Sequence, residues 1–277
     1  MPISAFIQTL DEEQNLPRCL ESVSWSDDIV VLDSFSTDRT MDIAKAAGAR
    51  VFQRPYDGRA NNQNWAVENI EFKHPWVYYS DADEVVPAEL RDEILEVTSD
   101  PSRPEVAYRV RFKNMFCGKW IRHSSGYPSW IARLWRPDKI RWQRKANPVA
   151  VIDGPVGFLK NHFYHYSFNK GFYAWFEKHN KYSSYEAVET IKELDKGSID
   201  WKGLICKDPV RRRIALKHLS FRMPARPAAK FIYQYLLRMG FLDGGPGLTY
   251  CLLQSVYEYM IWCKVKELRR REKGLPL

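Results

Sequence analysis

Three carboxylates, Asp81, Asp83 and Glu84, directly follow a short apolar run. That run, at 76–79, contains only aromatic and β-branched residues, which predicts a strand that ends where the acids begin. Side chains at the carboxyl end of such a strand lie where open α/β sheets bind ligands. A turn after the strand can direct Asp81 and Asp83 at one hard cation that shares its shell with a diphosphate. An acidic turn that caps the next helix, at 87–97, is the alternative.

The residues before this run alternate between predicted strands and helices. Strands are expected at 3–8, 28–33 and 50–53. The helices between them are expected to run from an N-cap at Asp11 to about Val23, and over 39–47 and 61–70. Three more strands, at 106–112, 130–135 and 149–152, would extend the sheet. This alternation predicts an α/β domain with a Rossmann-like, mainly parallel sheet flanked by helices.

The cysteines and the N-terminus indicate a cytoplasmic protein. The five cysteines, at positions 19, 117, 206, 251 and 263, are scattered and have no C-x-x-C spacing. They are expected to be reduced core residues, not a disulfide or zinc framework. The first ten residues lack a charged region followed by a cleavage site, so no signal peptide is expected. A chain of 277 residues is long enough for one main domain with an appendage.

The basic residues are concentrated near the C-terminus. The net charge is +8, and residues 209–242 contain eight basic residues and no acidic one. They are Arg211, Arg212, Arg213, Lys217, Arg222, Arg226, Lys230 and Arg238. Such a segment is typical of a surface that meets an anionic partner. We found no DNA- or RNA-binding motif, so nucleic acid is not expected to be that partner.

The C-terminal region is expected to be helical, over 172–194, 227–242 and 248–265. Charged residues interrupt the last two helices, and no run of about 18 uncharged apolar residues occurs, so no spanning helix is expected. Basic residues beside apolar helical faces favour peripheral attachment to an anionic membrane surface, through the basic residues of 211–230. A basic helical hairpin that packs on the rest of the protein is the alternative.

Four stretches, taken in order, resemble motifs of the family 2 glycosyltransferases, which have the GT-A fold. Their first strand usually ends in Thr-Tyr-Asn-Glu-Glu, and residues 9–13 read Thr-Leu-Asp-Glu-Glu. Their second usually ends in Val-Asp-Asp-Gly-Ser-Thr-Asp, and residues 32–38 read Leu-Asp-Ser-Phe-Ser-Thr-Asp. The third stretch, 59–66, has a basic residue and a late asparagine, and the fourth is the Asp-x-Asp at 81–83.

The resemblance implies a pocket for a UDP-sugar donor at these strand ends. The donor-binding residues that it implies are Thr9, Leu10, Glu12, Asp33, Arg59, Asn64 and Asp81. Thr9 and Glu12 would line the base and ribose, Asp33 would accept a hydrogen bond from a base N–H, and Arg59 would meet the diphosphate. Three of them have a structural alternative: a cap for Asp33, a first-turn helix acid for Glu12 and a solvated surface side chain for Arg59.

The resemblance also implies a divalent cation, Mg²⁺ or Mn²⁺, bound by Asp83 and Asp81. A late histidine often completes the metal shell in the GT-A fold, and His165 is the candidate here. A packed histidine satisfied by the backbone is the alternative. The cation would offset the charge that grows on the departing diphosphate.

The sequence departs from the family pattern where the catalytic base is expected. The pattern has His-Glu about seven residues before a glycine, but this chain has Asn147-Pro148 ahead of Asp153-Gly154. Neither asparagine nor proline can take the proton of an acceptor hydroxyl. Asp153, His123 and Glu84 are the candidate bases. A different alignment of the motif and an altered activity are the alternatives.

Within the family, the chain is most similar to the lipopolysaccharide-core branch, through His-Tyr-Ser at 165–167 and the run 231–247. The implied activity is metal-dependent, inverting transfer of a sugar, with glucose expected, to a glycolipid at the inner face of a bacterial inner membrane. The GT-A domain would span 1–168, with a donor half (1–100) and an acceptor half (101–168) that contains an acceptor-side loop at 114–127. Residues 169–277 would form the helical region. Transfer to polyprenyl phosphate and a donor-binding subunit without catalysis are the alternatives.

Overall fold

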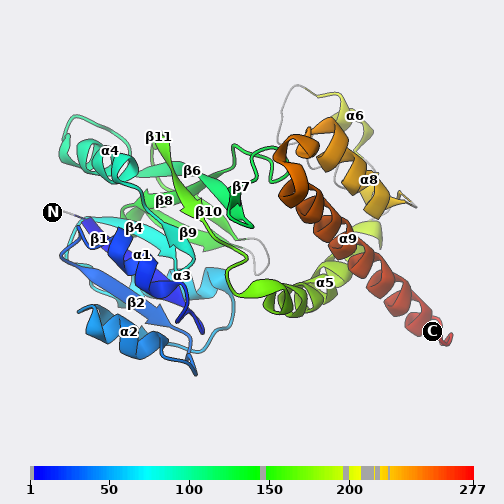
Figure 1. Ribbon diagram of the computed structural model, residues 1–277, viewed down its shortest axis with the longest axis horizontal. Coiled ribbons are helices and arrows are strands. Elements are labelled where there is room, and N and C mark those ends of the chain that lie inside the picture. The colour runs from blue at the N-terminus through cyan, green and yellow to red at the C-terminus, as the bar shows by residue number, and fades with distance from the viewer. Residues whose placement is uncertain (1–2, 144–147, 196–199, 207–214, 216–218, 224) are drawn as a thin grey trace. The chain divides into compact units, whose positions relative to one another are not determined.

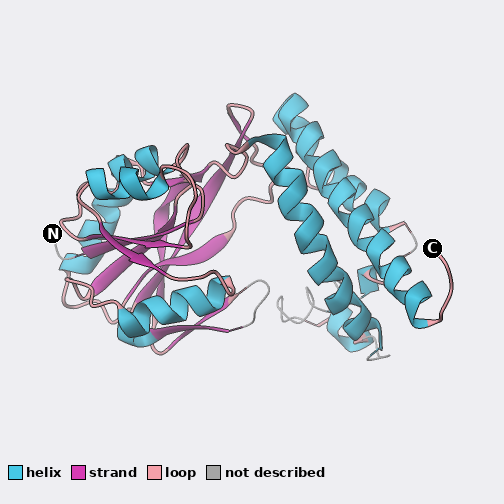
Figure 2. Cartoon of the chain, turned by 90° about the horizontal axis from the view of Figure 1, so that it is seen from below, coloured by secondary structure: helices cyan, strands magenta, loops and turns pink. Residues whose placement is uncertain are grey.

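The computed structural model describes residues 3–143, 148–195, 200–206, 215, 219–223 and 225–277 (Figures 1 and 2). It divides into two compact units: the first contains 1–120 and 127–169, and the second contains 121–126 and 170–277. Five residues singled out from the sequence lie outside the described residues. They are Asn147, Arg211, Arg212, Arg213 and Lys217.

Within the described residues, the first unit is built on a nine-stranded sheet (Figure 1). Its strand order is β3-β2-β1-β4-β8-β6-β11-β5, and β7 pairs with β6 outside this path. The strands are β1 (Ile3–Thr9), β2 (Ile29–Asp33), β3 (Arg50–Gln53), β4 (Trp76–Asp81), β5 (Glu84–Val85), β6 (Ala107–Phe116), β7 (Lys119–Trp120), β8 (Trp130–Trp135) and β11 (Val156–His165).

The expected mainly parallel sheet flanked by helices is confirmed. β1 pairs in parallel with β2 and β4, β2 with β3, and β6 with β11. β8 is antiparallel to both of its neighbours, β4 and β6. Because β2 and β4 lie on opposite sides of β1, the strand order reverses at β1. A reversal of this kind opens a crevice at the carboxyl ends of the strands, where α/β sheets bind ligands.

Alternating residues of β1 contribute to two apolar layers, one on each face of the sheet. The helices α1 (Leu16–Ser22), α2 (Thr40–Ala46) and α4 (Ala88–Ser99) contribute to one layer. The helix α3 (Arg59–Asn69) and the strand β9 (Ile140–Gln143) contribute to the other. A short 3₁₀ turn, η1 (Pro137–Lys139), precedes β9.

Two strands differ from the sequence-based expectation. β10 (Val149–Ile152) was expected to extend the main sheet, but it pairs with β9 in a separate two-stranded sheet. β11 was not anticipated, because the polar residues 160–162 interrupt its apolar pattern and its pairing with β6 shifts register between Phe158 and His162. Asp11 was expected to cap α1, but its φ of 52° is left-handed and the helix begins only at Leu16.

Asp28 is a buried carboxylate that connects three segments of the first unit. It accepts hydrogen bonds from the Ser4 hydroxyl, the Lys73 amide at 2.9 Å and the Arg50 Nε at 2.9 Å. Burial alone would raise the pKa of Asp28, but these donors outweigh it and lower the pKa below its ordinary value. A carboxyl with a lowered folded-state pKa stabilises the fold above its unfolded pKa, and that stabilisation is lost as the pH falls through the folded pKa.

We therefore expect Asp28→Asn to lower the free energy of unfolding by about 2 kcal/mol at pH 7, because hydrogen bonds to a buried charge are lost. The difference from the wild type should shrink as the pH falls below the unfolded pKa of about 4, because the wild-type carboxyl also becomes neutral. Urea unfolding at several pH values measures both effects. Asp27→Asn is the matched control, since Asp27 is an exposed neighbour that pairs with Lys73 and His74. Equal losses for the two variants would contradict the role of Asp28.

The second unit is helical in its described parts. Its elements are α5 (Gly171–Asp195), α6 (Trp201–Leu204), α8 (Arg226–Ile232), the π-helical turn η2 (Tyr233–Leu237), the 3₁₀ turn η3 (Gly240–Asp243) and α9 (Gly244–Glu272). The single helix expected over 227–242 is wrong, because the α-helix ends at Ile232 and Met239 has a left-handed φ of 56°. Among the described residues, no helix has both the length and the apolar character that crossing a membrane requires.

The glycine-rich run at 240–247 has a packing role within the second unit. A Cβ on Gly240 would lie 2.7 Å from the Gln234 carbonyl oxygen, and one on Gly247 would lie 2.4 Å from the Gly240 carbonyl oxygen. The buried Asp243 carboxylate accepts hydrogen bonds from the amides of His123 and Ser124 at 2.9 and 2.8 Å. The loop 121–126 is therefore anchored to this unit.

Candidate active site

The carboxyl ends of β1 and β2 carry the first two predicted donor residues. Thr9 and Asp33 are paired in register, and the Thr9 hydroxyl donates to the Asp33 carboxylate at 3.0 Å. The carboxylate is wholly buried, and it also accepts bonds from the Ser36 amide at 2.9 Å, the Ser36 hydroxyl and the Gln53 amide group at 3.2 Å. A base N–H would have to replace one of these donors to reach Asp33. The structure therefore gives Asp33 a bracing role in the loop.

The loops that follow β1 and β2 are fastened to each other. The Asp11 amide donates to the Ser36 hydroxyl at 2.8 Å, and the Thr37 amide donates to the Asp11 carboxylate at 2.7 Å. The Glu12 amide donates to the Thr40 hydroxyl at 2.7 Å. Leu10 and Phe35, one from each loop, are exposed. This edge of the sheet therefore has a polar floor and an apolar rim.

Asp81 ends β4 and is held by two arginines. Its carboxylate accepts from Arg59 at 2.6 Å, from Arg133 at 2.7 Å and from the Tyr79 hydroxyl at 2.6 Å. Burial would raise the pKa of Asp81, but the two guanidinium groups outweigh it and hold the pKa far below its ordinary value. Arg59 belongs to the first turn of α3 and remains partly exposed. Asp81 was expected to bind metal; its carboxylate contacts both arginines here, and the metal role stays a prediction.

Arg133 was missed in the sequence and is the central cation of the site. It is the extra residue of a β-bulge in β8, because Leu134 pairs with Tyr108 whereas Ala132 pairs with Arg109. A bulge redirects a side chain, and here Arg133 forms ion pairs with both Asp81 and Glu84 and lies 4.5 Å from the Tyr79 ring centre. Its side chain is only 3% exposed. The available signal was a charge within the apolar run 130–135.

The Glu84 side chain is buried below the surface of the site. It is 1% exposed, forms an ion pair with Arg133 and accepts from the Asp81 amide at 3.2 Å. Burial raises the pKa of Glu84 to about 7, although Arg133 opposes this effect. As a base for an acceptor hydroxyl, Glu84 would have to break its pair with Arg133. The geometry therefore favours a supporting role.

The pairing of β5 with β11 brings His165 beside Asp83. Glu84 pairs with His165 in this short ladder, and the Tyr166 amide donates to the Asp83 carbonyl oxygen at 2.9 Å. The Nε2 atom of His165 lies 3.3 Å from the Asp83 carboxylate, and its Nδ1 atom lies 3.0 Å from the side-chain oxygen of Asn114. Burial would lower the pKa of His165, but Asp83 outweighs it and raises the pKa. Asn114 thus orients the ring, as outer partners of metal-binding histidines do.

The ligand atoms available here fit a hard divalent cation. Asp83, Glu84 and His165 each offer one atom, and these atoms lie within 4.8 Å of one another. Carboxylate oxygens with one imidazole suit Mn²⁺ or Mg²⁺. Asp83 and His165 are the accessible members, each about one-quarter exposed. The sequence-based set names Asp81 with Asp83 and His165, and Glu84 is an additional candidate ligand here.

The other two candidate bases lie elsewhere. Asp153 is exposed, and its amide donates to the Lys139 carbonyl oxygen at 2.9 Å. This point is beside the end of β8, where Trp135 pairs with Val77 near the start of β4. Asp153 therefore lies near the Trp135–Val77 pair, whereas Asp81 ends β4, and the role of Asp153 as the base stays a prediction. His123 belongs to the second unit and stays a prediction.

Asn64, a predicted donor residue, is used inside the first unit. Its amide group donates to the Trp142 carbonyl oxygen at 2.8 Å and accepts from the Trp142 amide at 2.8 Å. Both ends of the side chain therefore fasten α3 to β9. These bonds give Asn64 a packing role, and its role as a donor contact stays a prediction.

Cations and aromatic rings alternate on the half of the sheet built by β6, β8 and β11. Lys113 lies 4.5 Å from the Trp120 ring centre and 5.5 Å from that of Tyr164. Arg111 lies 5.6 Å from the Trp130 ring centre. These side chains are half-buried, in the part of the first unit that the sequence assigns to an acceptor.

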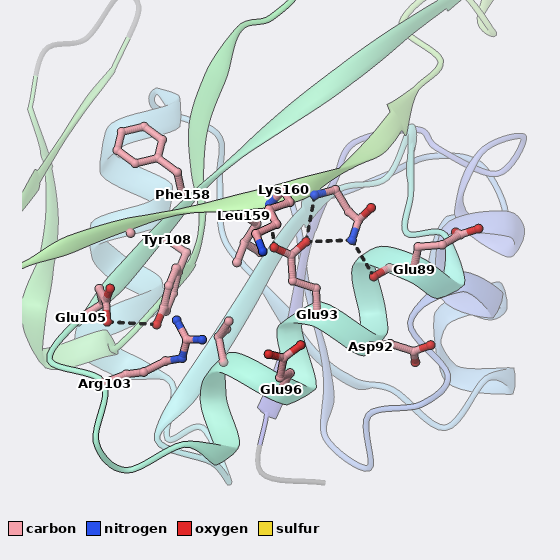
Figure 3. Close-up of a pocket in the computed structure, with 13 residues that line it drawn as sticks. Glu89, Asp92, Glu93, Glu96, Arg103, Glu105, Tyr108, Phe158, Leu159 and Lys160 are labelled. Atoms are coloured by element: carbon pink, nitrogen blue, oxygen red, sulfur yellow. Dashed lines mark hydrogen bonds between the residues drawn. The ribbon is translucent and has the colours of Figure 1, made fainter.

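A hollow of about 350 Å³ lies between α4 and β11, and its acidic side chains support the fold (Figure 3). Glu93 accepts from the amides of Lys160 and Asn161 at 2.6 and 2.8 Å, next to the register shift in β11. The residues that line it are separate from Asp83 and His165.

Comparisons with known proteins place the chain in a family. The family model described as glycosyl transferase family 2 matches residues 4–166. The chain therefore belongs to glycosyl transferase family 2, as its motifs imply, and is a glycosyltransferase.

Two relatives and one solved structure illustrate its similarities. An uncharacterized glycosyltransferase of Rickettsia typhi is 25% identical over 285 residues, 99% of this chain and 89% of the relative. The lipopolysaccharide core biosynthesis glycosyltransferase LpsC of Rhizobium meliloti is 32% identical over 164 residues, 57% of this chain and 60% of the relative. The mannosyltransferase PcManGT of Pyrobaculum calidifontis, solved with GDP-Man and Mn²⁺, is 15% identical; the match covers 95% of this chain and 86% of that one, with a TM-score of 0.49.

Proposed function

We propose that the chain transfers a sugar, with inversion, from a UDP-sugar to a lipopolysaccharide-core glycolipid. The observation that carries this proposal is the group of Asp83, Glu84 and His165 beside the Arg59–Asp81–Arg133 ion pairs, at the edge where the strand order reverses. The similarity to LpsC supports the acceptor class. Glucose is the sugar that we expect.

On the donor side, positively and negatively charged side chains lie close together. Arg59 is the accessible guanidinium and would exchange its bond to Asp81 for one to the diphosphate. Arg133 would then hold Asp81 in place from the buried side. Asp83 and His165 would bind Mn²⁺ or Mg²⁺, which when bound supplies a Lewis acid for the leaving diphosphate.

On the acceptor side, the face that carries Arg111, Lys113, Trp120 and Trp130 suits an anionic glycan. Aromatic rings pack against the apolar faces of sugars, and the two cations would meet phosphate or carboxylate groups. His123 remains the candidate base from the second unit.

For the membrane, the second unit offers apolar as well as basic side chains. Seven large apolar residues between 232 and 242 are exposed: Ile232, Tyr233, Leu236, Leu237, Met239, Phe241 and Leu242. Arg222 and Lys230 are half-buried near this segment in the sequence. Arg226 was also expected to meet lipid, but it forms an ion pair with Glu258 at 2.9 Å and is mostly buried. An apolar segment with neighbouring cations is typical of interfacial binding at the inner face of a bacterial membrane.

We expect the double variant Leu236→Glu/Leu237→Glu to lower binding to vesicles of anionic lipid at least about 10-fold, because two apolar side chains that would enter the interface become charged. Co-sedimentation measures the bound fraction. The matched control is Val149→Glu/Val151→Glu, which changes two exposed valines of β10 in the first unit. Equal binding by wild type and the Leu236/Leu237 variant would contradict membrane attachment through this segment.

Transfer assays test the proposed activity. The full chain is incubated with Mn²⁺, labelled UDP-glucose and either lipopolysaccharide-core oligosaccharide or undecaprenyl phosphate. Label in the oligosaccharide supports the proposal, and label in the polyprenyl phosphate favours the related lipid-carrier activity. UDP binding by calorimetry without transfer or hydrolysis of any nucleotide-sugar would instead indicate a donor-binding subunit.

A further inference from the structure

Phe35 has an unusual backbone conformation for a bulky residue. It follows β2 with a φ of 61°, in the left-handed region that favours glycine. The corresponding motif of the family has glycine here. An L-residue with a Cβ is strained in this region, and such strain persists only where the surrounding structure enforces it.

The surrounding hydrogen bonds do enforce it. The next residue, Ser36, donates its amide to Asp33 at 2.9 Å and accepts the Asp11 amide at 2.8 Å. The preceding residue, Ser34, donates its amide to the Thr9 carbonyl oxygen at 2.9 Å. The backbone on both sides of Phe35 is thereby fixed to the loop after β1.

Core packing does not compensate for the strain. Phe35 is 52% exposed, and within the described residues its ring has no aromatic partner. Leu10, in the loop fastened to it, is 44% exposed. The polar group beneath this rim, Asp33, is buried and already has its hydrogen-bond donors. Leu10 and Phe35 therefore form an exposed apolar pair at this end of the site, next to the exposed Asp11 and Thr37.

We propose that the ring of Phe35 packs against the face of the donor nucleobase, with Leu10 beside it, an inference that rests on the proposed donor site. Every nucleobase has an apolar π-face, and an exposed aromatic ring on a rigid loop is suited to stack on it. The diphosphate would lie at Asp81 and Asp83, on the other side of β1, so the base and the diphosphate would be recognised by separate residues.

The experiment compares Phe35→Gly with the wild type for two probes in the presence of Mn²⁺: UDP and inorganic pyrophosphate. Glycine relieves the strain but removes the ring, so we expect a higher Tm together with about 10-fold weaker UDP binding by calorimetry. Pyrophosphate has no base, so its affinity should stay unchanged. Phe35→Tyr keeps the ring and should bind UDP as the wild type does.

Cys117→Gly is the matched control, because Cys117 is another exposed residue with a left-handed φ, 48°, in the turn after β6. It should gain stability without any change in UDP affinity. If Phe35→Gly binds UDP as tightly as the wild type does, the stacking inference is wrong, but the proposed donor site still stands. Equal weakening of UDP and pyrophosphate would also overturn it, since a disturbed loop would then be the cause. A wild-type protein that binds neither UDP nor GDP would overturn the proposed donor site as well.

Discussion

Replacement of Asp83 by asparagine is expected to lower kcat/KM for sugar transfer by about 10³-fold or more, equivalent to roughly 4 kcal/mol of transition-state stabilisation. Asp83 is the most accessible carboxylate of the metal-ligand group, and its partner His165 cannot supply a negative charge. The neutral amide would bind a hard cation much more weakly. Calorimetric titration with Mn²⁺ should therefore show weakened binding in the same variant.

Asp92→Asn is the matched control for this variant. Asp92 lies on α4, is exposed and pairs with the neighbouring Arg91. It should leave both transfer and Mn²⁺ affinity unchanged. An Asp83→Asn protein that is folded, binds Mn²⁺ normally and transfers sugar at the wild-type rate would contradict the assigned metal site.

Replacement of Arg133 by methionine is expected to cost about 3–5 kcal/mol of folding stability, because Glu84 and Asp81 lose a buried counter-charge. Burial already raises the pKa of Glu84 to about 7. A carboxyl with a raised folded-state pKa costs stability as the pH rises above its unfolded value. The loss in Arg133→Met should therefore be larger at pH 8 than at pH 5.5, where Glu84 can stay neutral.

Denaturant unfolding at the two pH values measures this loss. Arg136→Met is the control, since Arg136 follows the same strand but is exposed, and it should change stability by no more than about 0.5 kcal/mol. The double variant Arg133→Met/Glu84→Gln removes both members of the pair and should recover part of the stability. Additive losses at Arg133 and Glu84 would show that the ion pair does not couple them.

The sequence predicted the features that depend on local pattern. Strands that alternate with helices identified the sheet, and the acids after Tyr79 identified its ligand-binding edge. The family that four short motifs implied was confirmed, and three of these motifs lie at predicted strand ends. These patterns can be recognised in a single sequence because they depend on residue types within a few positions of one another.

The features that were missed depend on register between distant strands. The position of Arg133 results from a bulge opposite β6, and its ion pair with Asp81 follows from that bulge. Asn64 looked like a donor contact because its motif is local, but Trp142, 78 residues later, uses both ends of its amide. The left-handed Met239 likewise lies beside the closely packed Gly240 and Gly247, which helical periodicity does not reveal.

The ladder between β5 and β11 makes the site dependent on the order in which the chain is completed. Asp83 and His165 are neighbours only when the last strand of the sheet has docked on the residues that follow β4. A growing chain that has emerged only to α4 has the donor motifs but no complete ion-binding group. Because a ligand that binds only the native state stabilises it, ion and nucleotide would secure this late strand.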